Sequence, residues 1–424
     1  RYMLNAGLSY EILDWLSVSG RVRLDNSTND YTEKFYASTN DQLTEGSSRG
    51  LYSITRTQDK QLYADFLVNI NKTFGTDWSL SANIGASISD VREDAVQVRG
   101  PIADGTDKFS GEPVGLTNWF NIQNLSSTST RLQTGYREQT QSIFASAEIG
   151  YKSTYYLTLT GRNDWPSQLA GPKSTSKSFF YPSVGASVLL SELMPNLNKD
   201  YLSYLKIRGS WASVGTPFQR YLANPRYEWN GNQWSITTQY PMYNLKPERT
   251  ESFEVGLTMR FLKNFDLDVT YYNAKTKNQT FNPRLSVSGY SAIYIQTGAV
   301  RNQGVELSLN YQNTWNKFTW DTGFTYSMNR NKILTLADNA VNPATGEIFS
   351  VDQLDMGGLG EARFLLREGG TMGDLYSQID LARDDQGRIY VDQNGNVATQ
   401  TISDPKNYIK LGSVLPKGNL AWRN

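Results

Sequence analysis

The residues best suited to binding a solute are aromatic side chains in the polar segments of this chain. Aromatic rings stack on sugars or peptide side chains, and they anchor protein interfaces. Long ordered segments also need small apolar cores, so the same rings could have a purely structural role. Seven of them are candidate contacts for a solute or for a covering protein: Trp119, Tyr136, Tyr227, Trp229, Trp234, Tyr240 and Tyr290.

Catalysis is disfavoured by two absences. The 424 residues include no cysteine and no histidine, which removes thiol nucleophiles, Ser-His pairs, histidine-ligated metals and imidazole bases. The carboxylates of Asp266 and Asp268 alternate along one segment, and this spacing alone does not indicate acid–base chemistry. We therefore expect neither an enzyme nor a cofactor or metal site.

The segment 61–88 indicates that β-strands position the candidate aromatic residues. Apolar and polar residues alternate along two runs with a short turn between them, and this period of two predicts a β-hairpin. Each run is long enough for a tilted strand to cross a bilayer, which takes about 9 to 11 residues, whereas strands of soluble sheets average about 5 or 6. The apolar positions are Leu62, Ala64, Phe66, Val68, Ile70, Trp78, Leu80, Ala82, Ile84, Ala86 and Ile88.

Five further hairpins repeat this pattern along the chain. Their turns are expected near 11–14, 152–154, 191–204, 262–264 and 313–317, and long polar loops at about 25–58, 89–140, 162–178, 214–249, 272–302 and beyond 329. Short turns on one side and long loops on the other are typical of outer-membrane barrels. Aromatic residues directly after the turns, such as Trp78 and Phe265, predict a girdle at the periplasmic rim. The predicted fold class is an all-β, transmembrane antiparallel β-barrel with long extracellular loops.

Charged residues fall on the polar face of the predicted strands. A charge on the lipid face would cost about 2–4 kcal/mol near the midplane, so these side chains are expected to face the lumen. They could hold a plug or line a path for solute, or they could pair with one another across strands. The set comprises Arg21, Arg23, Asp65, Glu148, Arg208, Glu254, Arg260, Asp266, Asp268, Glu306 and Asp321.

Composition narrows the class of protein further. Lys plus Arg equals Asp plus Glu, 41 each, so no charge excess points to nucleic acid. Mean hydropathy is −0.51, and the sequence has no run of about 18 apolar residues that would predict a membrane helix. The chain begins at Arg1 and ends in what resembles the start of a strand. We expect an internal piece of a longer protein.

Several segments resemble the SusC/RagA-like TonB-dependent transporters of Bacteroidetes. They occur in the family's order across most of the chain, which makes the resemblance specific. The segments are "YLTLTGRNDWPSQL" at 156–169, "FFYPSVGASVLLSE" at 179–192, "YLKIRGSWASVG" at 204–215, "NLKPERTESFEVGLTMRFLKNFDLDVTYYNAKTKNQTF" at 244–281 and "GAVRNQGVELSLNYQN" at 298–313. In the family, the first of these is a strand that ends in an Arg-x-Asp loop.

The resemblance implies an outer-membrane importer of oligosaccharides or oligopeptides. Family members have a plugged barrel of about 22 strands, a segment that engages TonB, and a SusD-like lipoprotein lid; pairs of such transporter–lid units can form dimers. Residues 1–424 would form about half of such a barrel wall in contact with outer-membrane lipid. A plug, a TonB box and the C-terminal closing strands are not recognisable in them.

One segment departs from the family's pattern. Many members carry an Asp/Asn/Gly-rich stretch resembling a calcium loop, which here reads "DDQGRIYVDQNGNV" at 384–397. Val397 stands where an EF-hand-type loop needs glycine, and no glutamate follows at the twelfth position. The dipeptide Asn394-Gly395 favours a tight turn instead, so a turn and a cation site both remain open.

Two other classes of protein fit part of the sequence. A passive porin or a barrel-based surface adhesin would share the strands but lack a plug. A soluble all-β carbohydrate-binding protein would share the alternation, although no blade-length repeat is present.

Overall fold

One large sheet dominates the structure, a computed structural model that describes residues 1–424 except 172–173, 224–227, 231–232, 236–244, 282–294 and 342–344. Thirteen antiparallel strands follow one another in the order β1-β2-β3-β4-β5-β6-β7-β8-β11-β12-β13-β14-β23. Their bounds are β1 (Tyr2–Leu13), β2 (Leu16–Phe35), β3 (Leu51–Phe74), β4 (Trp78–Pro101), β5 (Thr130–Tyr151), β6 (Tyr155–Pro166), β7 (Phe179–Leu189), β8 (Leu202–Thr216), β11 (Glu248–Phe261), β12 (Phe265–Phe281), β13 (Ile295–Trp315), β14 (Phe318–Thr335) and β23 (Asn419–Arg423).

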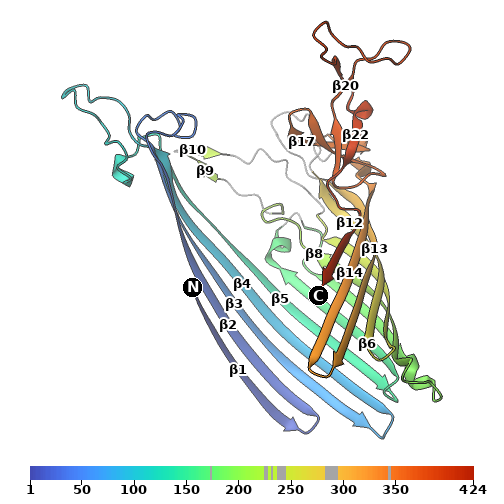
Figure 1. Cartoon of the computed structure of the whole chain (residues 1–424). Coiled ribbons are helices and arrows are strands. Elements are labelled where there is room, and N and C mark those ends of the chain that lie inside the picture. Colours follow the sequence, from blue (N-terminus) through green and yellow to red (C-terminus); the bar gives the residue numbers. More distant parts are fainter. Residues whose placement is uncertain (172–173, 224–227, 231–232, 236–244, 282–294, 342–344) are drawn as a thin grey trace.

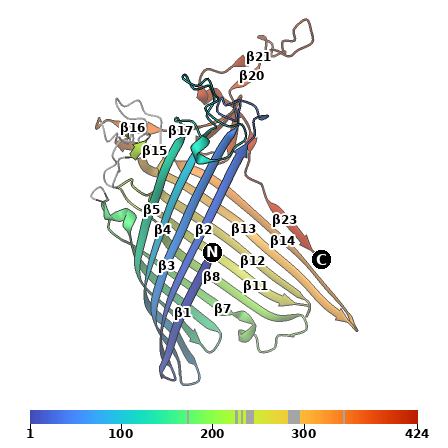
Figure 2. The same cartoon turned by 90° about the vertical axis from the view of Figure 1, so that its left-hand side faces the viewer.

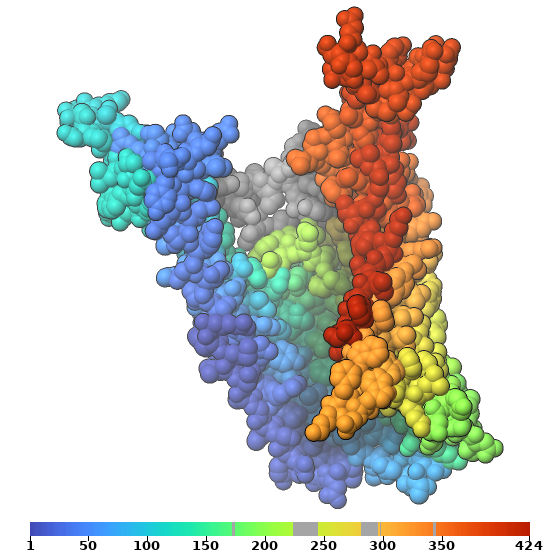
Figure 3. Space-filling view, viewed as in Figure 1, coloured from blue at the N-terminus to red at the C-terminus, as the bar shows by residue number. Residues whose placement is uncertain are grey.

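The sheet is bent into a trough, with β1–β5 along one side and β12–β14 along the other (Figures 1 and 2). Short turns lie at one end, the turn end, and long connections at the other, the loop end. The space-filling view shows the hollow inner face of the trough between these two sides (Figure 3). The predicted transmembrane antiparallel wall and its six hairpins are therefore confirmed.

Alternation explains which face each side chain occupies. Phe66 and Ile84 lie 53% and 55% exposed on the outer face, where lipid would cover them. Asp65, which directly precedes Phe66, lies on the inner face and is buried. Two residues at the β5–β6 turn, Lys152 and Ser153, both have φ of 51°, the left-handed pair that a tight hairpin turn requires.

The strands extend well beyond the predicted lengths, so the predicted loop bounds were wrong. Segments 25–35 and 51–60 belong to β2 and β3, which stay paired in register from Leu16↔Ile70 to Phe35↔Leu51. Backbone pairing continues because it needs no apolar side chains, whereas alternation ends where the apolar band ends. Residues 162–166 likewise remain in β6, so the Arg-x-Asp sequence lies in a strand and not in a loop.

Beyond β14 the chain forms a smaller unit at the loop end before it returns as β23. A four-stranded sheet has the order β17-β18-β19-β22, and a buried cluster that includes Ile333, Leu336 and Leu366 joins this unit to the wall.

The remaining strands lie outside the large sheet. Two of them, β9 (Glu228–Asn230) and β10 (Gln233–Ser235), lie between β8 and β11. The others lie beyond β14: β15 (Ala337–Val341), β16 (Ile348–Val351), β17 (Gln353–Leu359), β18 (Ala362–Arg367), β19 (Asp374–Ser377), β20 (Ile379–Leu381), β21 (Thr399–Thr401) and β22 (Ile409–Ser413).

Helical structure in the described ranges is confined to single 3-10 turns. These are η1 (Ile122–Asn124), η2 (Ser167–Ala170), η3 (Leu190–Leu193) and η4 (Pro405–Asn407). None of the helices in the described part of the chain is long and apolar enough to cross a membrane.

Candidate functional site

Several charged residues on the inner face of the wall form ion pairs. Arg21 on β2 lies opposite Asp65 on β3, and their closest atoms, Nη2 and Oδ2, are 2.9 Å apart. Arg260 on β11 pairs in the same way with Asp266 on β12, with 2.8 Å between Nε and Oδ1. Of the two roles that the sequence left open, these four residues show pairing across strands.

One of these pairs reaches across an intervening strand. Arg208 on β8 donates two hydrogen bonds, of 3.0 and 2.8 Å, to the carboxylate of Asp268 on β12. Gly256 on the intervening strand β11 makes room for it, because a Cβ there would lie 2.5 Å from the guanidinium carbon of Arg208. Arg208 also donates to the hydroxyl oxygens of Thr258 and Thr270, at 2.6 and 2.7 Å. The result is a rigid, polar patch of inner wall.

A second polar group surrounds the Arg-x-Asp sequence of β6. Arg162 donates from Nε to Asp164 at 2.7 Å and from Nη2 to the hydroxyl of Ser142 at 2.7 Å. The phenol of Tyr181 on β7 donates to the other carboxylate oxygen of Asp164. The spacing of two in the sequence could have identified Arg162 and Asp164 as neighbours on one face, and the sequence reasoning missed it.

Near the loop end, a loop residue reaches the inner face of β5. The guanidinium carbon of Arg220, from the connection between β8 and β11, lies 3.4 Å from the ring centroid of Tyr136. Its Nε is also 3.2 Å from a carboxylate oxygen of Glu138, two residues along the same strand face. This trio, Tyr136, Glu138 and Arg220, offers an aromatic face, an anion and a cation in one place.

A buried apolar cluster anchors the connection that carries Arg220. Leu169, Phe218, Leu222 and Leu245 are all at most 4% exposed, and they pack together with Ala223. Thr175 adds a hydrogen bond of 2.9 Å from its hydroxyl to the carbonyl of Leu245. No pattern in the sequence indicates the contact of Arg220 with β5, because the two are far apart in the chain.

Trp119 lies elsewhere, in the connection between β4 and β5. Its side chain is 47% exposed, and its carbonyl accepts a hydrogen bond of 2.7 Å from the amide of Asn124. Among the described residues, no contact joins Trp119 to Tyr136, so the structure does not bring these two candidates together.

The other five predicted residues are only partly covered by the described ranges. Trp229 and Trp234 lie opposite each other where β9 pairs with β10, and this pairing concerns the backbone. Tyr227, Tyr240 and Tyr290 lie outside the described residues.

The connection that carries Trp119 is held by a carboxylate. Asp104 accepts hydrogen bonds from the hydroxyl and the backbone N–H of Ser48, at 2.7 and 3.0 Å, and lies 3.0 Å from Nε of Arg49. The Ser48 bonds, with a further contribution from the Arg49 charge, lower the pKa of Asp104 to about 2. This group ties the segment 36–50 to the segment 102–129.

Segment 384–397 turns at Asn394 and Gly395, but not as the expected type I′ turn, because Gly395 has a positive φ and Asn394 does not. Gly395 has φ of +84°, and Asp392 accepts bonds of 2.9 and 2.7 Å from the backbone N–H groups of Asn394 and Asn396. In the described part of the chain, no three acidic side chains gather in a way that could hold a metal ion.

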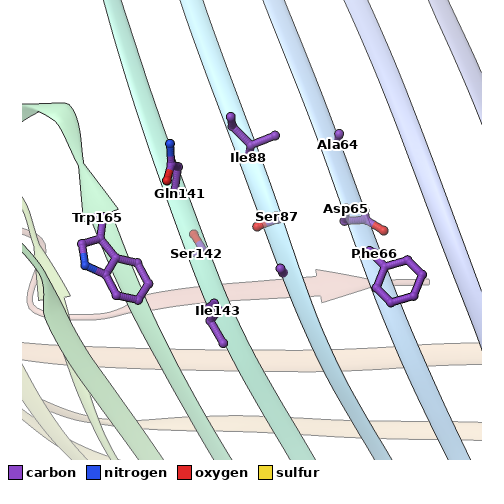
Figure 4. A pocket seen from close by; sticks show the side chains of 10 residues that line it. Ala64, Asp65, Phe66, Ser87, Ile88, Gln141, Ser142, Ile143 and Trp165 are labelled. Carbon is purple, nitrogen blue, oxygen red and sulfur yellow. The ribbon is translucent and has the colours of Figure 1, made fainter.

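A groove of about 700 Å³ lies on the outer face of β3–β5 (Figure 4). Phe66, Ile88, Ile143 and Trp165 line it together with small residues, and its surface is mainly apolar. Because it shares the face of the apolar band, it is a lipid-facing groove and not a solute site.

Fold and site together define the wall of a transmembrane barrel with a polar lumen. Residues 1–413 match the family described as TonB dependent receptor-like, beta-barrel, and the chain belongs to that family. It is similar to two proteins of Formosa agariphila: TonB-dependent receptor P3 (28% identity, 63% of this chain, 27% of that protein) and TonB-dependent receptor P26 (28%, 73% and 33%). The chain thus spans about a quarter to a third of these relatives.

Solved structures show the same fold. A chain of the RagAB peptide transporter superposes with a TM-score of 0.75 at 17% identity, covering 99% of this chain and 45% of that chain. The siderophore receptor PiuA from Acinetobacter baumannii superposes with a TM-score of 0.50 at 15% identity, covering 90% of this chain and 55% of that chain. The resemblance to SusC/RagA-like transporters is confirmed, and the chain is an outer-membrane barrel protein of a family of receptors and transporters.

Proposed function

We propose that this chain is the wall of an energised importer of oligosaccharides or oligopeptides. The observation that carries the proposal is the trio of Tyr136, Glu138 and Arg220 on the inner face near the loop end. Arg220 covers one face of the half-buried Tyr136 ring, so a sugar ring or a side chain would stack on the opposite face, while the charged groups of Glu138 and Arg220 would hydrogen-bond to polar groups of a solute. The chain takes no part in covalent chemistry.

The other parts of the importer lie outside this chain. A plug would fill the lumen against the paired inner-face charges, and TonB would displace it with energy from the inner membrane. A SusD-like lipoprotein would close over the loop end, and two transporter–lid units could form a dimer. Support comes from the family and from the likeness to a structure named as a peptide transporter.

Uptake of labelled oligopeptides and oligosaccharides into cells carrying the full-length protein tests this proposal. Uptake should stop in cells without TonB, and Tyr136→Leu should reduce it about three- to tenfold through loss of the ring contacts. Tyr390→Leu, an exposed tyrosine in the unit beyond β14, is the matched control and should leave uptake unchanged.

The test also separates the alternatives. Uptake that persists without TonB would identify a passive porin and overturn the proposal. Surface attachment without uptake of either solute class would identify an adhesin. The outer-membrane location already removes a soluble carbohydrate-binding protein from consideration.

A further inference from the structure

Four cations gather on the outer face of β12–β14 just beyond the apolar band. Lys275, Arg301, Arg330 and Lys332, here called the basic rim, share the strand face that carries Tyr271 and other outward apolar residues nearer the turn end. Lys275, Arg330 and Lys332 are exposed and Arg301 is half-buried. The basic rim therefore lies where the lipid-facing band meets the loop end.

Strand register places three of these charges side by side. Lys275 on β12 lies opposite Arg301 on β13, which in turn lies opposite Lys332 on β14. Directly opposed residues have Cα atoms only about 4.5–5.5 Å apart, and like charges in such positions are destabilising. Arg330 lies two residues from Lys332 on the same face, so the repulsion is not relieved on that side.

The protein does not neutralise this row. Within the described residues, none of the four cations has an ion pair, and Nε of Arg301 is buried without a hydrogen-bond partner. The nearest acid on this face is Glu251, opposite Lys275, but its Oε2 lies 2.7 Å from Nζ of Lys277. Glu251 still attracts Lys275 at longer range, which leaves the rest of the row unbalanced.

A comparable row of cations lies on the other side of the trough, and one of its members pairs with an acid. Lys60, Arg92 and Arg137 are also directly opposed on the outer face, across β3–β5. There, Arg137 donates to Asp90 with bonds of 2.5–3.1 Å, and Gln139 donates to the same carboxylate at 3.1 Å. An acid one row away thus pairs with a member of that row, whereas Glu251, the acid beside the basic rim, pairs with Lys277 and leaves the rim a place for an external anion.

We propose that the basic rim binds the phosphate-bearing headgroup of an outer-leaflet glycolipid. Arginine and lysine bind phosphate through charge-assisted hydrogen bonds, and a phosphate would relieve the repulsion in the row. The apolar band directly below offers Tyr271, Val305 and Met328 to the acyl chains of the same molecule. An amphiphile would contact both the cations and the adjoining apolar surface. A soluble anion would contact the cations alone. The inference rests on the outer-membrane location and not on the proposed transport function.

Lipid binding to the detergent-solubilised full-length protein tests the proposal. Native mass spectrometry would measure binding of phosphorylated lipid A and of enzymatically dephosphorylated lipid A. The variant Lys275→Gln/Arg301→Gln/Lys332→Gln should bind phosphorylated lipid A roughly tenfold more weakly than wild type. Wild type should show a similar preference for the phosphorylated lipid over the dephosphorylated one.

A matched control removes three exposed cations at the loop end outside the basic rim. Lys34→Gln/Lys108→Gln/Lys406→Gln changes net charge equally and should bind lipid A as wild type does. Equal binding by the basic-rim variant, or equal binding of dephosphorylated lipid by wild type, overturns the proposal. Full competition by inorganic phosphate at the lipid's own concentration overturns it as well, because it would identify a soluble-anion site. The wild-type lipid comparison decides the question even if the triple variant fails to fold.

Discussion

Two adjoining parts of the wall reach different heights: β3–β5, here called the tall side, and β6–β8, here called the short side. Strands β3, β4 and β5 have 24, 24 and 22 residues, whereas β6, β7 and β8 have 12, 11 and 15. On the tall side, backbone pairing continues far beyond the apolar band (Figure 1). On the short side, the strands end near the band and connecting segments take over.

The difference shows two ways of ordering a chain above a membrane. The tall side satisfies its backbone groups in a ladder, so its side chains need no core. The short side loses the ladder, and its connections instead bury Leu169, Phe218, Leu222 and Leu245. Arg220, carried by that packed segment, then reaches across to Tyr136 on the tall side. A fixed surface and a loop-borne side chain meet in the candidate site.

Breaking the packed core of the short side should have the largest effect. Leu245 is fully buried, and Leu245→Ala should destabilise the connection by about 2–5 kcal/mol through lost burial and a residual cavity. Cleavage by trypsin after Arg220, in the full-length protein in bilayers, would report this loosening. Leu43→Ala removes the same atoms from a side chain that is 56% exposed and should leave cleavage unchanged. Equal cleavage of both variants would show that the cluster does not order the short side.

Arginine placed at two heights of β4 tests which part of the tall side lies in lipid and which part lies above it. Ile84 and Val96 lie on the same face of β4, 55% and 49% exposed, but Ile84 is in the apolar band and Val96 is in the extension. Ile84→Arg should cost about 2–4 kcal/mol because it places a charge in lipid. Val96→Arg should stay within about 0.5 kcal/mol, as expected for a surface change.

Equilibrium unfolding from bilayers by denaturant measures both variants. Similar losses would mean that lipid, or another apolar environment, covers the extension too. In that case the tall side would be a taller membrane wall, and the division between band and extension would be wrong.

Sequence patterns predicted the apolar band better than the extension above it, because only the band contacts lipid. Alternation such as Leu62 to Ile70 records contact with lipid, so it identified six hairpins and their faces. Above the band both faces meet water, and nothing in segment 51–60 distinguishes a paired strand from a loop. Side-chain pairing was predictable between neighbours such as Arg21 and Asp65, but not where Arg208 crosses Gly256 to Asp268. Trp119 and Tyr136 were grouped by residue type, which carries no information on distance.

The smallest expected effect concerns the segments above the tall side. Asp104 joins them through Ser48 and Arg49, and its pKa of about 2 lies below the usual value near 4. A carboxyl whose pKa is lowered by folding adds stability above pH 4, and this stability is lost as the pH falls towards 2. Its side chain is 39% exposed, so solvent screening limits the gain to about 1 kcal/mol. Asp104→Asn should lose that amount at neutral pH and should flatten the acid response.

Hydrogen exchange at the Ser48 amide, corrected for the intrinsic pH dependence of exchange, reads this contribution directly. The wild-type amide donates to Asp104 at 3.0 Å, so its protection should fall between pH 4 and pH 2 while the variant changes little. Ser110 provides an internal comparison, because its amide donates to Asp107 at 2.8 Å and that carboxyl also has a lowered pKa. In Asp104→Asn, Ser110 should keep its acid response while Ser48 loses it. Loss at both amides would show that the segments above the tall side unfold together, so the tall side would then depend on loop packing as the short side does.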